Sequence, residues 1–254
     1  MSADLTEDTV LGGRLRLKQP RHGHRVGHDA ILLAAACPAR AGERAVDLGA
    51  GVGAAGLALA IRVDGTNVTL VEVDADLAAL AMENAQLNGL AERVDAVVLD
   101  VAGPAPAFAA AGLGPQSVAR VLMNPPFNDP ARQRVSPDRR RRLAHAAPGG
   151  TLPAWIKTAA RLLRPRGTLT IIWRADGLAD VLRALDSAFG AATVLPVHSR
   201  PGEAAIRVLV RAARASRAPL TLLPGLVLND RAGRPTAQAE SVLRGGAVLP
   251  LSEL

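Results

Sequence analysis

Apolar, β-branched runs recur along this chain and alternate with segments in which apolar residues repeat at helical spacing. The runs predict strands over Arg44–Leu48, Val68–Val73, Val94–Leu99, Val118–Met123, Thr168–Trp173 and Ala205–Arg211, with Ala192–Val197 as a further candidate. The helical spacing predicts helices over Asp29–Ala36, Ala54–Val63, Asp76–Asn88, Pro153–Leu163 and Leu178–Phe189. Strands that alternate with helices indicate an α/β fold, in which a largely parallel sheet is covered on both faces. The ligand site of such a sheet is expected at the carboxyl ends of its strands, near the point where the strand order reverses.

Local signals mark the ends of some of these elements. Residues 1–13 are mostly polar and predict a lead-in that is mobile at its start. Asp29 is placed to cap the helix that it begins. Pro165 and Gly167 follow the helix Pro153–Leu163 and predict its end.

The composition limits the size and the chemistry of the core. The chain has 254 residues, which is enough for one large α/β domain but leaves little room for a second. Aromatic residues make up 2% of the chain and hydrophobic residues as a whole 49%. The core is therefore expected to consist of Leu, Val, Ile and Ala.

The net charge is +7, from 30 basic and 23 acidic residues, and all the basic residues except Lys18 and Lys157 are arginines. Two interpretations of this charge stay open. A basic balance suits a polyanionic partner, because neutralised phosphates release their counterions. The excess of Arg, together with abundant Ala, also fits a coding bias without functional meaning.

Other features bear on the compartment. Cys37 is the only cysteine, so an internal disulfide cannot form. The N-terminus lacks the basic, apolar and small-residue pattern of a leader. Apolar stretches stay below the roughly 18 residues that span a bilayer. A cytoplasmic protein without membrane contact is expected.

A glycine-rich segment, Asp47–Gly53, closes the first of these strands and opens the helix that follows it. Glycine allows the backbone to turn sharply and to approach a ligand closely. Dinucleotide enzymes use similar glycine patterns, so the glycines alone do not identify the ligand. Asp47 can accept from an ammonium group or from an ordered water, whereas its negative charge would repel a pyrophosphate.

Carboxylates also end the next two strands. Glu72 can accept hydrogen bonds from both ribose hydroxyls of a nucleoside, and Asp100 from the amino group of an adenine. Asp74 is better placed to cap the following helix. Any one of these acids fits a solvated strand end. Acids at three successive strand ends, behind a glycine loop, favour a nucleoside ligand.

The order of these motifs from about residue 19 to 211 resembles the class I methyltransferases that use S-adenosylmethionine. The resemblance implies a Rossmann-like fold with a seven-stranded sheet whose final strand is reversed. It also implies a cofactor site lined by Gly49, Gly51, Glu72 and Asp100. We expect Asp47 and Arg25 to border this site as well. A dehydrogenase would share the glycine loop but would not account for the next motif.

The tetrapeptide Asn124-Pro125-Pro126-Phe127 directly follows the strand Val118–Met123. A nitrogen on adenine or on an amide is a poor nucleophile, because its lone pair is delocalised. The Asn124 side-chain oxygen and the Pro125 carbonyl can accept from its two N–H groups and orient it. The consecutive prolines fix the backbone and remove competing donors. Phe127 can stack on a flat substrate. The alternative is a proline-rich turn whose Phe packs inward.

This tetrapeptide resembles that of amino-methyltransferases acting on adenine N6, guanine N2 or protein glutamine, and Phe in the fourth position leans toward nucleic acid. Segments 19–30, 128–130 and 228–234 are similar to the bacterial tRNA1(Val) adenine-N6 methyltransferase family. His24 stands where that family usually has an aromatic residue. Three histidines lie close together (His22, His24 and His28), but a lid over the cofactor suits this segment better than a metal site.

Arginines follow the tetrapeptide and are candidates for phosphate contacts, notably Arg132, Arg139 and Arg140. Each of them alone fits a solvated helical face equally well. RNA, and tRNA in particular, is the expected partner.

Together these features predict an N-methyltransferase that acts on N6 of an adenine in tRNA, at the position 3′ to the anticodon. The alternatives are an enzyme acting on rRNA guanine N2, protein glutamine N5 or a small molecule. A more distant one is an inactive protein of the same fold that binds cofactor or RNA. The expected organisation is one domain over residues 1–254, with a lid and helix over 1–40, a Rossmann-like core over 41–211 and a C-terminal extension over 212–254.

Overall fold

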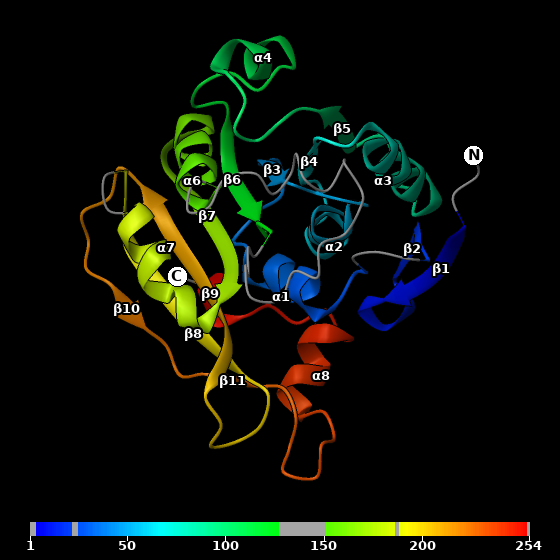
Figure 1. Ribbon diagram of the computed structural model, residues 1–254. Coiled ribbons are helices and arrows are strands. Elements are labelled where there is room, and N and C mark those ends of the chain that lie inside the picture. The colour runs from blue at the N-terminus through cyan, green and yellow to red at the C-terminus, as the bar shows by residue number, and fades with distance from the viewer. Residues whose placement is uncertain (1–3, 22–24, 127–150, 186–187, 253–254) are drawn as a thin grey trace, which may run out of the picture.

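The computed structural model describes residues 4–21, 25–126, 151–185 and 188–252, which form one large sheet, a separate hairpin and the surrounding helices (Figure 1). The order of the large sheet is β10-β8-β9-β7-β6-β3-β4-β5. Its long strands are β3 (Arg44–Leu48), β4 (Asn67–Glu72), β5 (Val94–Val98), β6 (Val118–Met123), β7 (Leu163–Arg174), β8 (Phe189–His198) and β9 (Ala205–Arg214). Two-residue strands, β10 (Thr221–Leu222) and β11 (Leu226–Val227), both pair with β8.

Only β9 is antiparallel to its neighbours, β7 and β8, and the other pairs in the described sheet are parallel. The prediction of an α/β fold with a mostly parallel sheet and a reversed last long strand is therefore confirmed. The chain adds the two short strands at the β8 edge.

Helices cover both faces of the sheet (Figure 1). The helices of one face are α1 (His28–Ala36), α2 (Ala54–Arg62) and α3 (Ala75–Leu87), with α8 (Ala237–Leu243) outside α1. Those of the other face are α4 (Ala105–Ala110), α6 (Thr151–Leu162) and α7 (Leu178–Leu185). Each face has its own buried apolar cluster, and both clusters consist almost entirely of aliphatic residues and alanine. The described helices are all too short or too polar to cross a membrane.

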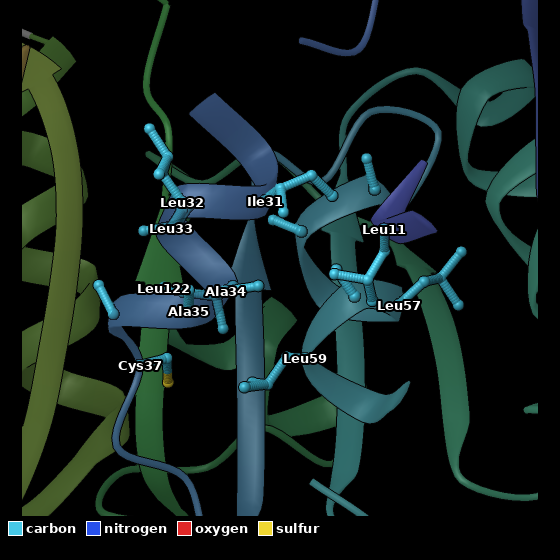
Figure 2. Packing of buried hydrophobic residues seen from close by; sticks show 14 of the residues in the cluster. Leu11, Ile31, Leu32, Leu33, Ala34, Ala35, Cys37, Leu57, Leu59 and Leu122 are labelled. Carbon is cyan, nitrogen blue, oxygen red and sulfur yellow. The ribbon is translucent and has the colours of Figure 1, made fainter. Parts of the chain in front are cut away.

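Helix α1 is surrounded by other elements, which explains why it has so little polar surface. Its residues from Ile31 to Ala36 are all buried, between the sheet, α2 and α8. Figure 2 shows Leu32 and Leu33 on α1 near Leu122 of β6, and Ile31 on the side facing α2. A helix that is apolar on every side needs such partners on every side.

Two predictions at the start of the chain are wrong. Residues 4–13 are not a polar lead-in, since β1 (Leu5–Val10) pairs in antiparallel fashion with β2 (Leu15–Pro20) through the turn Leu11–Gly13. Side chains of β1 alternate between exposed and half-buried, so this strand lacks the apolar run that marks the others. Asp29 does not cap α1, because Gly27 is the N-cap and Asp29 instead forms an ion pair with Arg207 (2.9 Å).

The hairpin is fixed to α3 by two asparagines one helical turn apart. The Asn84 side chain accepts from Lys18 N–H (2.7 Å) and donates to the Lys18 carbonyl (2.9 Å). Asn88 makes the same pair of contacts with Arg16, at 2.9 and 2.7 Å. Each side-chain amide thus forms with the backbone of β2 the two hydrogen bonds that a neighbouring strand would form. Asn84, which is fully buried, also donates to the Val52 carbonyl in the glycine loop (3.0 Å).

Other boundaries differ from the predictions by only a few residues. The predicted helix Leu178–Phe189 ends at Leu185, because Phe189 opens β8. Helices α4 and α8 were not predicted. They are 6 and 7 residues long, which is too short for a clear helical repeat.

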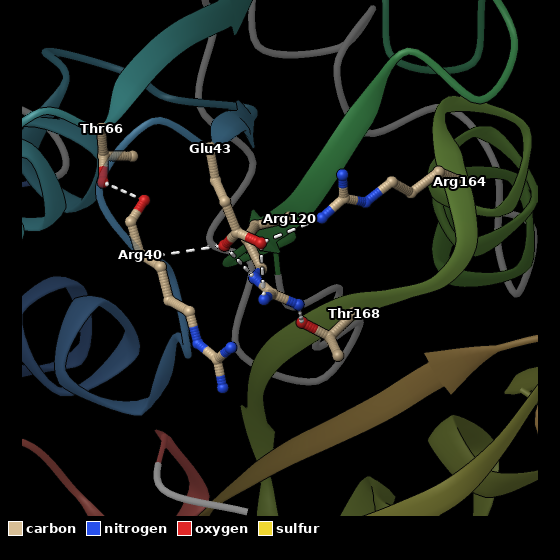
Figure 3. Close-up of polar contacts among 6 residues, drawn as sticks. All are labelled: Arg40, Glu43, Thr66, Arg120, Arg164 and Thr168. Atoms are coloured by element: carbon tan, nitrogen blue, oxygen red, sulfur yellow. Dashed lines mark hydrogen bonds and ion pairs between the residues drawn. The ribbon is translucent and has the colours of Figure 1, made fainter.

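A buried ion pair joins three elements at the amino edge of the sheet (Figure 3). Glu43, just before β3, accepts from Arg120 of β6 through both carboxylate oxygens, at 2.8 and 2.9 Å. These two side chains are only 14% and 11% exposed. Arg164, at the start of β7, adds a third contact (3.0 Å) but is 55% exposed. The buried pair should matter far more to stability than the exposed one.

We predict that Glu43→Gln lowers the free energy of unfolding by about 3 kcal/mol, because Arg120 would keep its charge in a buried position without a counter-charge. Arg164→Gln is the matched control and should cost less than about 1 kcal/mol, since an exposed pair contributes little. Urea denaturation of both variants measures the difference. Equal losses would contradict this ranking.

Candidate functional site

The strand order reverses between β3 and β6. The chain passes from β3 to β4 and β5 on one side, and then returns to β6 on the other side of β3. Leu48 pairs with Met123 across this junction. Gly49 and Asn124 are the next residues, so the glycine loop and the Asn-Pro-Pro segment begin side by side at the carboxyl edge. This is where a ligand site is expected in an open α/β sheet.

The glycine loop is tied to β4 by its backbone. The N–H groups of Gly49 and Ala50 both donate to the Val71 carbonyl, at 2.8 and 3.0 Å. Gly51 and Gly53 have φ of +56° and +87°, a region that favours glycine. A Cβ at Gly53 would meet three side chains within 3.3 Å, whereas a Cβ at Gly51 would meet nothing within 4 Å. Gly53 therefore serves the packing of the loop, and Gly51 leaves room for a ligand to approach the backbone.

Glu72 lies at the end of β4 with its carboxylate turned to this loop. Its Oε2 accepts from Gly51 N–H (2.8 Å), and its Oε1 accepts from the N–H groups of Val73 (2.8 Å) and Asp74 (3.0 Å). Three backbone donors thus hold a carboxylate that is only 8% exposed. Each carboxylate oxygen has about two lone pairs, so Oε2 retains the capacity to accept from a hydroxyl.

Asp47 lies beneath the loop rather than in its open side. It is 2% exposed, and its Oδ2 accepts from Gly56 N–H in α2 (2.8 Å). Burial raises the pKa of Asp47 to about 7, the Gly56 hydrogen bond opposes this rise, and the nearby charge of Glu72 adds to it. Asp47 thus contacts α2 through Oδ2, and its role in binding the cofactor stays a prediction.

Asp100 and Asp74 lie at the outer part of the site. Asp100 comes two residues after the end of β5 and is exposed, and its Oδ1 accepts from Ala102 N–H (2.8 Å). Asp74 caps α3 by accepting from Asp76 and Leu77, as predicted. Val73, between Glu72 and Asp74 in the chain, is 55% exposed although it directly follows a buried strand. Exposed apolar surface beside carboxylates fits a ligand with a flat ring and hydroxyl groups, such as a nucleoside.

Asn124 has a buried acceptor without a donor. Its Oδ1 is inaccessible to solvent and accepts no hydrogen bond from the part of the chain that the structure describes. Pro125, which follows it, is buried. A buried acceptor left without a partner costs about 1–3 kcal/mol. Such an atom next to a glycine loop fits a site that a bound N–H group completes.

Not all the residues predicted for the site can be placed. Phe127, Arg132, Arg139, Arg140, His22 and His24 lie outside the described residues, and their roles stay predictions. Arg25 forms an ion pair with Asp8 of β1 (2.7 Å), which attaches it to the hairpin. His28 is exposed at the first position of α1.

Two residues at the site were missed in the sequence. Val73 was counted as the last residue of a strand, where an apolar side chain needs no further explanation. Trp155 of α6 packs against Gly49, a contact between segments more than 100 residues apart. Periodicity does not reveal such a contact, and the small number of aromatic residues is the only signal that pointed to Trp155.

Comparisons with known proteins agree with this arrangement. A family model described as methyltransferase small domain matches residues 24–200. The release factor glutamine methyltransferase of Chlorobaculum tepidum is 32% identical over 161 residues, which are 61% of this chain and 53% of that enzyme. The tRNA1(Val) (adenine(37)-N6)-methyltransferase of an Enterobacter species is 33% identical over 153 residues, 58% of each chain. The chain thus matches little more than half the length of these two curated relatives.

A solved structure extends the likeness to almost the whole fold. The crystal structure of a predicted O-methyltransferase from Agrobacterium tumefaciens aligns with a TM-score of 0.74 at 32% identity. The alignment covers 87% of this chain and 98% of that one. It therefore includes parts of the chain beyond residues 24–200.

The buried carboxyl group of Asp47 predicts a specific pH dependence. The folded protein keeps the Asp47 proton up to about pH 7, whereas the unfolded chain releases it near the ordinary pKa of 3.8. Between these values the folded state binds more protons, so stability falls as the pH rises. We expect Asp47→Asn to remove this fall, which amounts to roughly 4 kcal/mol over the whole interval at about 1.4 kcal/mol per pKa unit.

Urea denaturation at several pH values between about 5 and 8 measures this effect. The Asn side chain can still accept from Gly56 N–H, so packing is kept while the titrating group is lost. Parallel stability curves for the two proteins over this range would contradict the prediction.

Proposed function

Because this chain belongs to the methyltransferase small domain family, we propose that it transfers the methyl group of S-adenosylmethionine to the exocyclic N6 of an adenine in tRNA. The family match bears out the predicted class of enzyme and its cofactor. The acceptor, its position in the tRNA and the roles of individual residues are the content of the proposal.

The single observation that carries the proposal is the buried Oδ1 of Asn124, which lies beside the glycine loop and has no hydrogen-bond partner among the described residues. An exocyclic amino group has two N–H groups. One can donate to Asn124 Oδ1 and the other to the Pro125 carbonyl. Two fixed acceptors hold the nitrogen in one orientation and draw electron density toward it. The burial of Asn124 Oδ1 and of Pro125 strengthens this effect, since water competes less for these acceptors.

The residues of this chain have separate tasks in the proposed reaction. Gly51, Glu72 and Val73 bind the cofactor, which supplies an electrophilic methyl group when bound. Asn124 and Pro125 hold the acceptor nitrogen at the neighbouring strand end, so that positioning provides most of the rate enhancement. A strong general base is not required, because the extra proton can leave after the nitrogen has been methylated.

Three observations support adenine in RNA as the acceptor. Phe127 follows the two prolines and offers a ring on which a base can stack. Arginines at positions 132, 139 and 140 provide charge for phosphates next to the same segment. The Enterobacter relative is named for methylation of adenine in tRNA.

The second candidate is methylation of a protein glutamine. A relative with a similar identity, from Chlorobaculum tepidum, is named for that activity. A glutamine side chain also presents a planar nitrogen with two N–H groups, so the same two acceptors would serve it. Guanine N2 and small-molecule acceptors share this chemistry.

We expect Asn124→Ala to lower the turnover of methyl transfer by at least about 100-fold, because one of two preorganised acceptors is lost. Binding of S-adenosylhomocysteine, measured by calorimetry, should stay within about twofold, since Asn124 faces the acceptor. The matched control is Asn67→Ala, an exposed asparagine at the start of β4 on the opposite edge. Near-normal turnover of the Asn124 variant would refute the mechanism.

The acceptor is tested by labelling. Purified protein and S-adenosylmethionine with a labelled methyl group are incubated with unmodified total tRNA, rRNA and a cell extract, and nucleosides and amino acids are separated by mass spectrometry. We expect the label in N6-methyladenosine from tRNA. Label in methylglutamine or N2-methylguanosine alone would replace the proposal with the corresponding alternative.

A further inference from the structure

Trp155 contacts the first glycine of the loop that closes β3. Gly49 has a φ of +72°, and a Cβ built on it would overlap Trp155 Cη2 and lie 2.8 Å from Cζ3. The six-membered part of the indole ring therefore lies directly on the Gly49 backbone. Trp155 is only partly buried, so some of its ring remains accessible to solvent.

The loop is held by two separate elements, β4 and α6. On the β4 side, the Val71 carbonyl accepts from Gly49 N–H, and Glu72 accepts from Gly51 N–H. The second contact comes from α6, where Trp155 packs on Gly49. A loop with several positive φ angles has few side chains of its own to fix its path, so these outside contacts decide where its backbone groups point.

Helix α6 is itself anchored to the outer part of the site. Thr158, one helical turn after Trp155, donates its hydroxyl to the Val101 carbonyl (2.8 Å), next to Asp100. The apolar face of α6 packs in the same buried cluster as Leu48 and Met123, the last residues of β3 and β6. Thus α6 touches the segments after β3 and β5 and packs below the segment that begins with Asn124.

We propose that Trp155 is a positioning residue for the methyl donor, which fixes the Gly49 backbone and reports the binding of the donor to the loop. This inference rests on the proposed function, since it assumes that the loop binds S-adenosylmethionine. The indole sets the path of the loop, and the loop then holds the donor opposite Asn124. Loss of the ring leaves the Gly49 backbone free to move and lowers the affinity for the donor. The acceptor groups at Asn124 and Pro125 stay in place.

Fluorescence offers a direct test, because the chain has two Trp and no Tyr. The other tryptophan, Trp173 of β7, packs near Gly177. Trp173→Phe leaves Trp155 as the only strong emitter. We expect S-adenosylhomocysteine to change the emission of this variant with saturation, and the emission of Trp155→Phe to stay nearly constant.

Steady-state kinetics supply the second readout. We expect Trp155→Leu to raise KM for S-adenosylmethionine about tenfold, because the loop is misplaced, with kcat and KM for the acceptor changed less than about twofold. Trp155→Phe keeps part of the ring and should recover most of the donor affinity. Trp173→Leu is the matched control and should leave KM for the donor unchanged.

The outcomes separate this inference from the proposed function. If calorimetry shows that S-adenosylhomocysteine binds while Trp155 emission stays constant, Trp155 is not a positioning residue and the proposed function is unaffected. An equal rise of both KM values in Trp155→Leu, or a loss of thermal stability alone, would likewise overturn the inference. If S-adenosylhomocysteine does not bind at all, both the inference and the proposed function are wrong.

Discussion

The register of β3 against its two neighbours is the constraint on which the rest of the structure depends. Leu48 pairs with Val71 of β4 on one side and with Met123 of β6 on the other. Parallel pairing therefore brings the segments after all three strands to the same height at one edge. A shift of one residue would turn the buried side chains of β3 to the opposite face. It would also separate Gly51 from Glu72 and the glycine loop from Asn124. The pairing of β3 with its two neighbours therefore determines where the site lies, and the side chains of the site depend on that pairing.

The same strand direction explains where the charges lie. In successive βα units the helices end at the amino edge of the sheet, where their last carbonyls are without helical partners and carry partial negative charge. Arginines donate to these groups. Arg93 donates to the Ala60 carbonyl near the end of α2, and Arg214 donates to the Ala160 carbonyl near the end of α6.

Arg120 is paired with Glu43 at this edge, while Asp47, Glu72 and Asp74 accept from backbone N–H groups at the carboxyl edge. Much of the described positive charge therefore has a structural task. The case for a polyanionic partner rests on the arginines after Phe127 and not on the net charge of +7.

The parts of the fold that the sequence predicted are those in which burial dominates. Strands β3 and β6 begin and end at the predicted residues because they lie in the middle of the sheet, where almost every side chain is buried. Strand β1 was missed because its stability comes from β2, which is held by the side chains of Asn84 and Asn88, and such contacts leave no periodic pattern. The site shows the same division. Glu72 ends β4 and Asn124 directly follows β6, so both lie at ends of strands that the sequence predicted, whereas the direction of the Asp47 carboxylate depends on one N–H group of α2. The exposure of Val73 and the contact of Trp155 with Gly49 likewise depend on how separate elements meet.

The hydrogen-bond acceptors that the proposed function assigns to this site suit both a base and a glutamine, the substrates for which two relatives are named. Asn124 Oδ1 and the Pro125 carbonyl match two N–H groups on a planar nitrogen, and this match is the same for adenine N6 and for a glutamine amide. These two hydrogen bonds therefore do not distinguish between the two substrates. Discrimination must come from groups that contact the rest of the substrate. An adenine has a large π face, and stacking on an aromatic side chain contributes about 1–3 kcal/mol per base. That energy corresponds to a preference of about 5-fold to 150-fold. A glutamine side chain presents only a small amide plane to the same ring and gains less from it. In the proposed reaction, Phe127 directly after the two prolines therefore favours a base over an amide, although the two hydrogen-bond acceptors treat them alike.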